Sequence, residues 1–460
     1  MPPPVLFSEP PGIRWGPFTL RLPLIHHRIE TPEALQGILV SCATGMAVVP
    51  LYIEHFAMSF ETAIAMVVVQ SVFVAAGFWL FGDPFCPGWL TPALPLVLRE
   101  ALAFSSIDGR IGFVNAVVLD VAALFLFLGA TGLSSAFVRA VPPPLKAAII
   151  LGAGISAILG EITSPVAGGA SRVDTYPITI SLAVGLTLVL LFSRPFEAWK
   201  KRSVTAARFA VLGIAPGFFL AMIVGPLVGE ISWDAFRFGD VLFRPDFTTL
   251  FRDYSVLGRG VPSLAVLLSA APVALAAYTI GFGDLITGTA IVEEAAAERG
   301  EEHVSLDARR THLAVGLRNA FTALLGGPFF PLQGPLWAGA TVVVCERYRQ
   351  GRAAMQSIFS GVGSYYLGVP FYYFVGPVLE LLRPMMGVAL SMTLLLTGFA
   401  CAYVALRVPR DRVERGTVLL AAMALAHFST AVGLAAGLGL TLLLLGPEAW
   451  RQPQQQAAAE

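Results

Sequence analysis

Charged residues are scarce in this chain. They make up 13% of its 460 residues, with 30 Lys and Arg balanced by 30 Asp and Glu. A soluble globular domain carries about 25% charged residues, so this chain cannot cover a water-facing surface of its size. The formal net charge of zero excludes a globally basic nucleic-acid-binding protein.

Cysteine and catalytic signatures are also few. The four cysteines lie far apart, mostly in apolar runs, and form neither a disulfide framework nor a zinc site. We interpret Cys42, Cys86, Cys345 and Cys401 as small buried residues. The sequence has no metal-ligand spacing, nucleophile elbow or nucleotide-binding loop. These absences argue against an enzyme or an ATP-driven pump, and no cofactor is expected other than a coupling ion, H⁺ or Na⁺.

Apolar segments dominate what is present. Hydrophobic residues make up 56% of the chain, and the mean hydropathy is +0.74. About 20 apolar residues suffice for one transmembrane helix. We therefore predict an all-α polytopic membrane protein with about fourteen spans. The predicted spans are residues 33–53, 60–81, 86–103, 112–132, 145–161, 176–193, 207–229, 262–290, 311–326, 331–346, 353–378, 382–406, 416–428 and 430–446.

Positive charges predict the orientation in the membrane. Arginine and lysine gather in the loops around residues 194–208, 299–310, 347–352 and 407–415, and positively charged loops stay in the cytoplasm. We expect a multi-pass protein of the cell (inner) membrane with both termini cytoplasmic. The predicted divisions are a cytoplasmic N-terminus (1–31), a first repeat (32–229), an extracytoplasmic linker (230–261), a second repeat (262–446) and a cytoplasmic tail (447–460).

An internal repeat relates the two halves. The segment GDPFCP at 82–87 recurs as GGPFFP at 326–331, an offset of 326 − 82 = 244. The same offset pairs Gly132 with Gly376 and Arg139 with Arg383. Seven spans per half is an odd number, so the second half must be inserted upside down. Inverted repeats with a Pro/Gly-interrupted segment at matching places predict an alternating-access transporter.

The matched segments predict the binding site. PFCPGWLTPALPLVL (84–98) and PFFPLQGPLWAGATVVV (328–344) each begin with residues that cannot continue a helix and then become apolar helices. We interpret them as half-helices, at spans 3 and 10, whose free N–H groups hold a solute. The candidate binding residues are Trp89, Thr91, Tyr278, Gln333, Gly334 and Trp337. Trp89 and Trp337 could instead be packing or lipid-facing residues.

Ionisable residues inside spans are costly and usually functional. Asp284 lies within a long apolar stretch, and we interpret it as part of the substrate or coupling-ion site, because burial favours the neutral form of a carboxyl group and so allows proton exchange. The alternative is a bond to a neighbouring helix. Asp120, Arg318, Asn319 and His427 also lie in or near spans, where a functional role and an interhelical bond are equally good interpretations.

Three segments resemble the xanthine/uracil permeases of the nucleobase/ascorbate transporter family. TPEALQGILVSCATGMAVVPL (31–51) is similar to their opening helix, AVPPPLKAAIILGAGI (140–155) to the entry of the fifth, and GLRNAFTALLGG (316–327) to the ninth. The resemblance implies fourteen spans as two inverted sevens, divided into a core domain and a gate domain. Related sulfate and benzoate permeases share that fold, so the fold alone names no substrate.

The resemblance fails at two functional positions. The acid that the family carries on its eighth helix falls on Tyr278, and the acid on its tenth falls on Gln333. Asp284 is then the nearby acid left for coupling.

Two functions remain open, besides a channel or a membrane-embedded enzyme. The first is a secondary transporter of a planar, nucleobase-like solute moved with a cation. The alternative is an anion permease of the sulfate or benzoate type that uses the half-helix dipoles. The expected partners are a small-molecule substrate and the lipid bilayer, with no nucleic acid, and a homodimer is left open.

Overall fold

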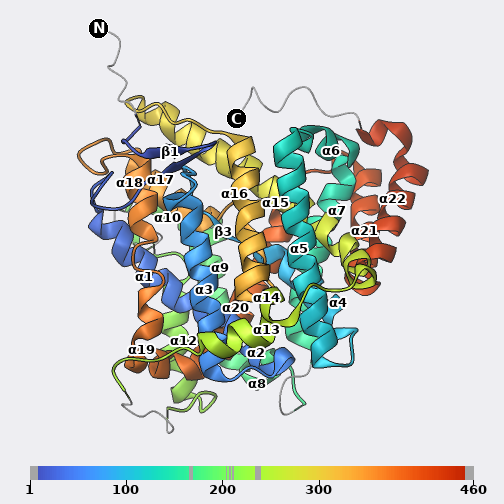
Figure 1. Ribbon diagram of the computed structural model, residues 1–460, viewed down its shortest axis with the longest axis horizontal. Helices are drawn as coiled ribbons and strands as arrows, with labels where there is room; N and C mark the ends of the chain where they lie inside the picture. Colours follow the sequence, from blue (N-terminus) through green and yellow to red (C-terminus); the bar gives the residue numbers. More distant parts are fainter. Residues whose placement is uncertain are drawn as a thin grey trace.

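Most helices run roughly parallel or antiparallel to one another between two ends of the molecule (Figure 1). The structure is a computed structural model, and it describes residues 9–164, 169–203, 205–206, 209, 212–233 and 240–450. Residues 1–8 of the predicted N-terminal segment and 451–460 of the predicted tail therefore lie outside the described residues, as do 207, 208, 210 and 211 of the seventh predicted span.

The first half of the chain opens with a short hairpin and continues as helices. The hairpin, β1 (Ile13–Trp15) and β2 (Phe18–Leu20), packs on the end of α3 through a hydrogen bond from Trp15 Nε1 to the Leu80 carbonyl oxygen of 2.8 Å. The elements that follow are α1 (Thr31–Gly45), α2 (Val49–Phe56), α3 (Phe60–Trp79), β3 (Gly88–Trp89), α4 (Leu94–Leu102), α5 (Ile107–Thr131), α6 (Ser134–Ala140), α7 (Pro143–Thr163), α8 (Arg172–Thr175), α9 (Pro177–Phe192), α10 (Arg194–Lys200) and α12 (Ala215–Leu227).

The second half repeats this pattern of long helices around one short extended piece. Its elements are α13 (Phe247–Tyr254), α14 (Val256–Arg259), α15 (Leu264–Arg299), α16 (Ala308–Phe321), the π-helical turn η3 (Thr322–Gly326), β4 (Gln333–Gly334), α17 (Ala338–Tyr348), α18 (Ile358–Tyr365), α19 (Gly376–Leu382), α20 (Met386–Ala405), α21 (Arg412–His427) and α22 (Thr430–Leu445).

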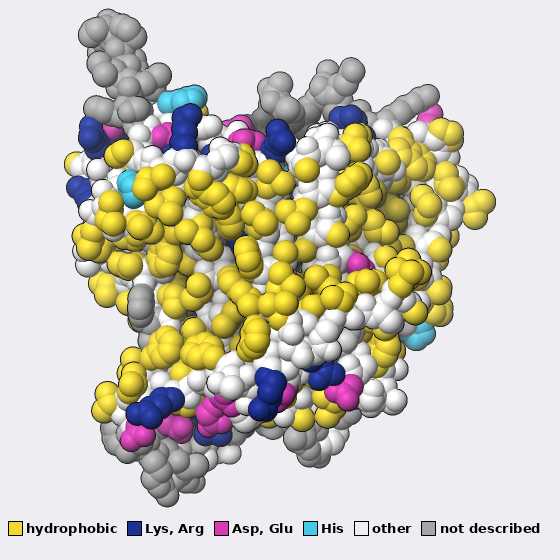
Figure 2. All heavy atoms as spheres, viewed as in Figure 1, with side chains coloured by type: hydrophobic (Ala, Val, Ile, Leu, Met, Phe, Trp, Pro, Cys, Tyr) yellow, Lys and Arg dark blue, Asp and Glu magenta, His cyan; other side chains and the backbone are white. Residues whose placement is uncertain are grey.

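The helices have the composition of membrane spans. Within the described residues, seven helices or continuous helical runs are long and apolar enough to cross a membrane, and the bent pair α9 and α10 would make an eighth. Hydrophobic side chains cover the middle of the visible face, and charged side chains gather at its two ends (Figure 2). The all-α membrane fold with half-helices is thus confirmed, whereas the number fourteen stays a prediction, because several segments, such as α12, are shorter.

One predicted span is not a continuous helix. We expected residues 353–378 to form a single span, but α18 ends at Tyr365 and the 3₁₀ turn Phe371–Phe374 follows only after a break. Pro370 lies in that break, and a proline ring can neither donate the helical hydrogen bond nor fit against the preceding turn. Tyr366, the first residue after α18, donates a hydrogen bond to the carbonyl oxygen of Pro87.

The helices pack into two groups. The first contains α1 to α5 and α15 to α18, and the second contains α7, α9, α12 and α20 to α22. Each group combines helices from both halves of the chain, as two intertwined repeats require. α20 packs against α7 and α9 within its own group and also touches the break between α1 and α2 in the other.

The two groups are joined at one end by a buried ionic network. Arg172 of α8 donates 2.8 Å hydrogen bonds to Glu161 Oε1 on α7 and to Glu54 Oε2 on α2. The second carboxylate oxygen of Glu161 accepts a hydrogen bond from Ser391 of α20. The Glu161 side chain is 2% exposed and that of Arg172 is 8% exposed. We call Glu54, Glu161, Arg172 and Ser391 the polar latch.

The opposite end of the molecule carries the arginine-rich loops. α5 ends there and α7 begins there, with the 3₁₀ turn Gly446–Trp450 held by a 3.0 Å hydrogen bond from Trp450 Nε1 to the Ala140 carbonyl oxygen. The β1–β2 hairpin, the end of α15 and the start of α16 lie at the same end (Figure 1).

This arrangement gives the first prediction. Glu197→Cys on α10 and Arg410→Cys before α21 should resist an impermeant thiol reagent added to intact cells, whereas Val261→Cys should react, because its position is 72% exposed at the latch end. The native cysteines give a low background because three are buried and Cys42 is partly buried. Labelling of Glu197→Cys from outside would reverse the orientation.

Candidate functional site

The two half-helices meet in the middle of the first helix group. β3 and β4 pair antiparallel, with Gly88 opposite Gly334 and Trp89 opposite Gln333. The second pair again reflects the 244-residue offset of the repeat. The pairing is extended by hydrogen bonds from Leu90 N to Leu332 O (3.1 Å) and from Trp337 N to Cys86 O (2.7 Å). The two halves of the chain thus meet at one point, where β3 pairs with β4, and a half-helix leads away from that point in each direction. We call the paired strands the crossing.

Glycine is required where the two segments cross. A Cβ atom on Gly88 would lie 2.6 Å from the carbonyl oxygen of Leu336 and 2.8 Å from the amide nitrogen of Trp337. These contacts are with backbone, which cannot move aside as a flexible side chain can. The preceding turn is also constrained, because Leu332 adopts a left-handed φ of 60°.

Gly88→Ala should therefore separate the half-helices. We expect it to lower the unfolding free energy by roughly 1–3 kcal/mol, the usual cost of overpacking, and to abolish substrate binding. Thermal unfolding and ligand binding of the purified protein measure both effects. Gly112→Ala on α5 is the matched control, because a Cβ atom there meets no atom within 4 Å. A Gly88→Ala protein that binds like the parent would show that the crossing tolerates displacement.

Polar side chains hold the crossing from behind. Arg318 Nη2 on α16 donates to the carbonyl oxygens of Gly88 (3.2 Å) and Gly334 (2.6 Å) and to Gln333 Oε1 (3.2 Å). Asn319 exchanges two hydrogen bonds with the backbone of Gln333, at 2.8 and 3.0 Å. Gln333 Nε2 donates to Gln70 Oε1 on α3 at 2.8 Å. The crossing is thus fixed by side chains from two helices of its own group.

A cavity of about 510 Å³ lies between the crossing and the second helix group. Its lining comes mainly from α1, the two half-helices, α15, α9 and α20, with further residues from α3 and α7. On α9 and α20 the lining residues include Leu191, Phe192, Cys401 and Val404, which lie in the parts of these helices nearest the arginine-rich end. The cavity therefore extends from the crossing toward that end, while the polar latch lies on the other side of it.

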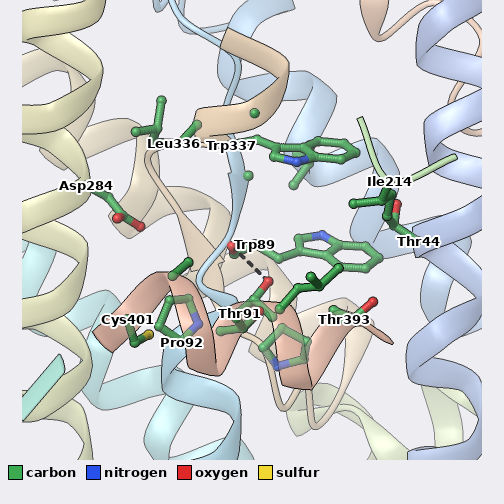
Figure 3. Close-up of a pocket in the computed structure, with 18 of the residues that line it drawn as sticks. Thr44, Trp89, Thr91, Pro92, Ile214, Asp284, Leu336, Trp337, Thr393 and Cys401 are labelled. Atoms are coloured by element: carbon green, nitrogen blue, oxygen red, sulfur yellow. Dashed lines mark hydrogen bonds between the residues drawn. The ribbon is translucent and has the colours of Figure 1, made fainter. Parts of the chain in front are cut away.

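Hydrogen-bond donors gather at the crossing. The indole rings of Trp89 and Trp337 lie one above the other, with their ring nitrogens on the facing edges (Figure 3). Trp89 Nε1 is buried and has no hydrogen-bond partner among the described residues. α17 begins at Ala338 without a side-chain cap, so the amides of Ala338 and Gly339, both in the lining, have no acceptor within the helix. The Thr91 hydroxyl lies close by and makes a long 3.5 Å hydrogen bond to Trp89 O.

Asp284 is the acidic side chain of the cavity. It points from α15 into the cavity across from the crossing (Figure 3). Its carboxylate has no hydrogen bond or ion pair among the described residues, whereas Thr287, one turn further on, lines the same wall. The described lining contains no lysine, arginine or histidine. The cavity therefore combines neutral donors at the crossing with one unpaired carboxylate opposite them.

The sequence-predicted residues divide into two sets. Trp89, Thr91, Trp337 and Asp284 line the cavity together. Tyr278, Gln333 and Gly334 do not. Tyr278 is fully buried and its hydroxyl lies 3.1 Å from His312 Nε2 of α16, and its ring packs against Phe125 of α5. Gln333 and Gly334 face Arg318 in the scaffold behind the crossing.

Some lining residues had no signal in the sequence. Ser41, Thr44, Tyr373 and Thr393 lie on α1, near α19 and on α20, far from the repeat motif, and they reach the cavity only because the two helix groups pack together. Small hydroxyl residues are common in transmembrane helices, where they usually bond to their own backbone, as Thr44 and Thr393 do here. Their place in the cavity needed the three-dimensional arrangement.

Comparisons with known proteins find the fold but no family. No protein-family model matches the sequence, and no curated protein sequence matches it. The transmembrane domain of the cyanobacterial bicarbonate transporter BicA matches with a TM-score of 0.51 and 16% identity, over 88% of this chain and 96% of that one. Murine Slc26a9, an anion transporter in its inward-facing state, matches with a TM-score of 0.51 and 12% identity, over 91% of this chain and 68% of that one.

A further structure of SLC26A9 has a TM-score of 0.54 and 13% identity, over 90% of this chain and 65% of that one. At these identities the matches show the fold alone. The chain therefore has the fold of these membrane transporters. The matched structures are anion transporters, and the xanthine/uracil permease family that the sequence resembles is not confirmed.

Proposed function

We propose that this chain is a secondary transporter that moves a small anion across a membrane by alternating access. The observation that carries the proposal is the set of neutral donors at the crossing, namely the Trp89 and Trp337 indole N–H groups and the first amides of α17. Free amides at a helix start attract negative charge through the helix dipole. The named anion transporters that share the fold support the same conclusion.

The nucleobase alternative has less support in the site. A nucleobase needs acceptors as well as donors, and the family that the sequence resembles supplies them as acids at the positions of Tyr278 and Gln333. In this chain Tyr278 contacts His312, and the side chain of Gln333 contacts Gln70 and Arg318. Neither side chain lines the cavity. Asp284 is the one carboxylate of the described lining.

The position of the cavity supports one conformational state of the proposed carrier. The cavity extends toward the arginine-rich end, which we predict from the loop charges to be cytoplasmic, and the polar latch joins the two helix groups at the other end. This is the arrangement of an inward-facing carrier. In the proposed cycle the latch separates as the two helix groups move past each other. Asp284 binds and releases the coupling cation, H⁺ or Na⁺, while the anion is bound across the cavity from it.

Ligand-induced thermal stabilisation of the purified protein tests this proposal. A ligand that binds only the folded state raises its stability in proportion to the logarithm of its concentration. Bicarbonate, sulfate, chloride and benzoate are compared with uracil and hypoxanthine, each at matched ionic strength. We expect stabilisation by at least one anion and by neither nucleobase. Stabilisation by the nucleobases alone would favour nucleobase transport instead. A transport rate that saturates with substrate concentration would distinguish a carrier from a channel.

A further inference from the structure

The cavity presents an electrostatic problem for an anion. Its described lining contains no basic side chain, and its one carboxylate repels negative charge. Helix-end dipoles supply only partial charges, of about half an elementary charge each. A full positive charge close behind the wall would strengthen the attraction, because the interior of the protein screens charges less than water does.

Arg318 supplies a charge in that place. Its side chain is among the largest that are fully buried, with 1% of its surface exposed. One nitrogen, Nη2, contacts the carbonyl oxygens of Gly88 and Gly334, which are paired residues of the two strands at the crossing. Gly88 lines the cavity, so the guanidinium lies one peptide layer behind the wall on which Trp89 and Trp337 lie.

No acid among the described residues forms an ion pair with Arg318, although Asp83 lies near enough to interact with its charge. Nε and Nη1 of Arg318 have no hydrogen-bond partner among the described residues. Asp83, an acid of the same buried layer, is instead bound by Arg310 at 3.4 Å and by the Thr311 hydroxyl at 2.8 Å. α3 closes over the guanidinium, since a Cβ atom on Gly77 would lie 2.6 Å from Nη1.

A buried charge without an ion-pair partner is costly, so we infer that the chain gains something from retaining it. The carbonyl contacts account for one nitrogen and for the alignment of the strands. They do not account for a full charge, because a neutral side chain such as glutamine could donate to a carbonyl as well. A positive potential at the crossing is what the charge adds, and an anion in the cavity is the species that would benefit from it.

We propose that Arg318 is the fixed positive charge of the anion site. It is a positioning residue that holds both half-helices, and its charge makes the cavity select anions over neutral solutes although Arg318 contacts neither. This inference rests on the proposed anion transport. It adds that selectivity comes from a residue on α16 that no substrate contacts, so the site prefers anions although its described lining has no basic side chain.

Quenching of tryptophan fluorescence tests the proposal, with iodide as the anionic probe and acrylamide as the neutral one. The Trp89→Phe/Trp337→Phe double variant gives the signal of the other tryptophans, and subtracting it isolates the cavity pair. At an effective dielectric constant of about 20, a unit charge about 10 Å away changes the local concentration of a monovalent anion roughly tenfold.

Arg318→Gln should therefore lower iodide quenching of the cavity pair roughly tenfold and leave acrylamide quenching unchanged. Arg318→Lys, which keeps the charge but loses the planar fork, should retain most of the iodide preference. Equal iodide quenching in the parent and in Arg318→Gln would overturn the inference, and so would loss of the fold in both variants, because Arg318 would then be purely structural. A parent protein whose cavity excludes iodide while admitting acrylamide would instead contradict the proposed function itself.

Discussion

Asp284→Asn should still bind the anion and exchange it across the membrane, yet fail to concentrate it. Asparagine has the shape of the protonated carboxyl group but can neither release a proton nor hold a sodium ion by charge. Asp284 faces the crossing from α15 and has no partner among the described residues, so removing its charge breaks no bond of the fold. A carrier locked in this form should equilibrate the substrate across the membrane without accumulating it.

Uptake into proteoliposomes under an imposed proton or sodium gradient measures this effect. Asp120→Asn is the matched control, because Asp120 also lies within a span, on α5, with one buried oxygen that has no hydrogen-bond partner, and it does not line the cavity. We expect Asp120→Asn to accumulate substrate as the parent does. Accumulation by Asp284→Asn would remove the coupling role from Asp284.

Arg172→Ala should produce the largest loss of stability. The substitution leaves Glu161, 2% exposed, as a buried carboxylate with no cation beside it. Removing one partner of a buried ion pair typically costs about 3–5 kcal/mol, because the remaining charge is desolvated without compensation. It also removes the 2.8 Å bond to Glu54, which joins the two helix groups at the latch end.

Thermal unfolding in detergent should show a marked decrease for Arg172→Ala. Arg252→Ala is the control, since Arg252 forms an ion pair with Asp253 on the exposed helix α13, and its loss should leave the transition unchanged. The latch has a second consequence in the proposed cycle. In an Arg172→Gln protein, Thr44→Cys in the cavity should become more reactive to an impermeant thiol reagent from the latch side. Unchanged stability in Arg172→Ala would show that the latch contributes nothing to either state.

The sequence was most informative where the repeat itself carries the structure. The 244-residue offset predicted two half-helices that face each other, and the structure pairs Trp89 with Gln333 at that spacing. Proline and glycine at matching places made this possible, since they specify where helices cannot continue. The rarity of charge within spans likewise singled out Asp284, which lies in the cavity wall.

Features that depend on distant contacts could not be predicted in the same way. A polar residue such as Gln333 in an apolar span is equally compatible with a binding site and with a scaffold, and only its bonds to Gln70 and Arg318 distinguish the two. The polar latch joins residues 54, 161, 172 and 391, whose separation in sequence hides their contact. Our proposal of an anion as the substrate rests on the donors around the cavity and on the named transporters that share the fold.

The central claim, that this fold carries an anion at the crossing of its half-helices, is tested most directly by solute counterflow. Proteoliposomes preloaded with unlabelled bicarbonate, sulfate, benzoate or uracil are diluted into a trace of the same labelled compound. The account predicts saturable counterflow of at least one of the three anions, lost in Gly88→Ala and retained in Asp284→Asn, with no counterflow of uracil. Saturable counterflow of uracil with none of any anion would contradict it.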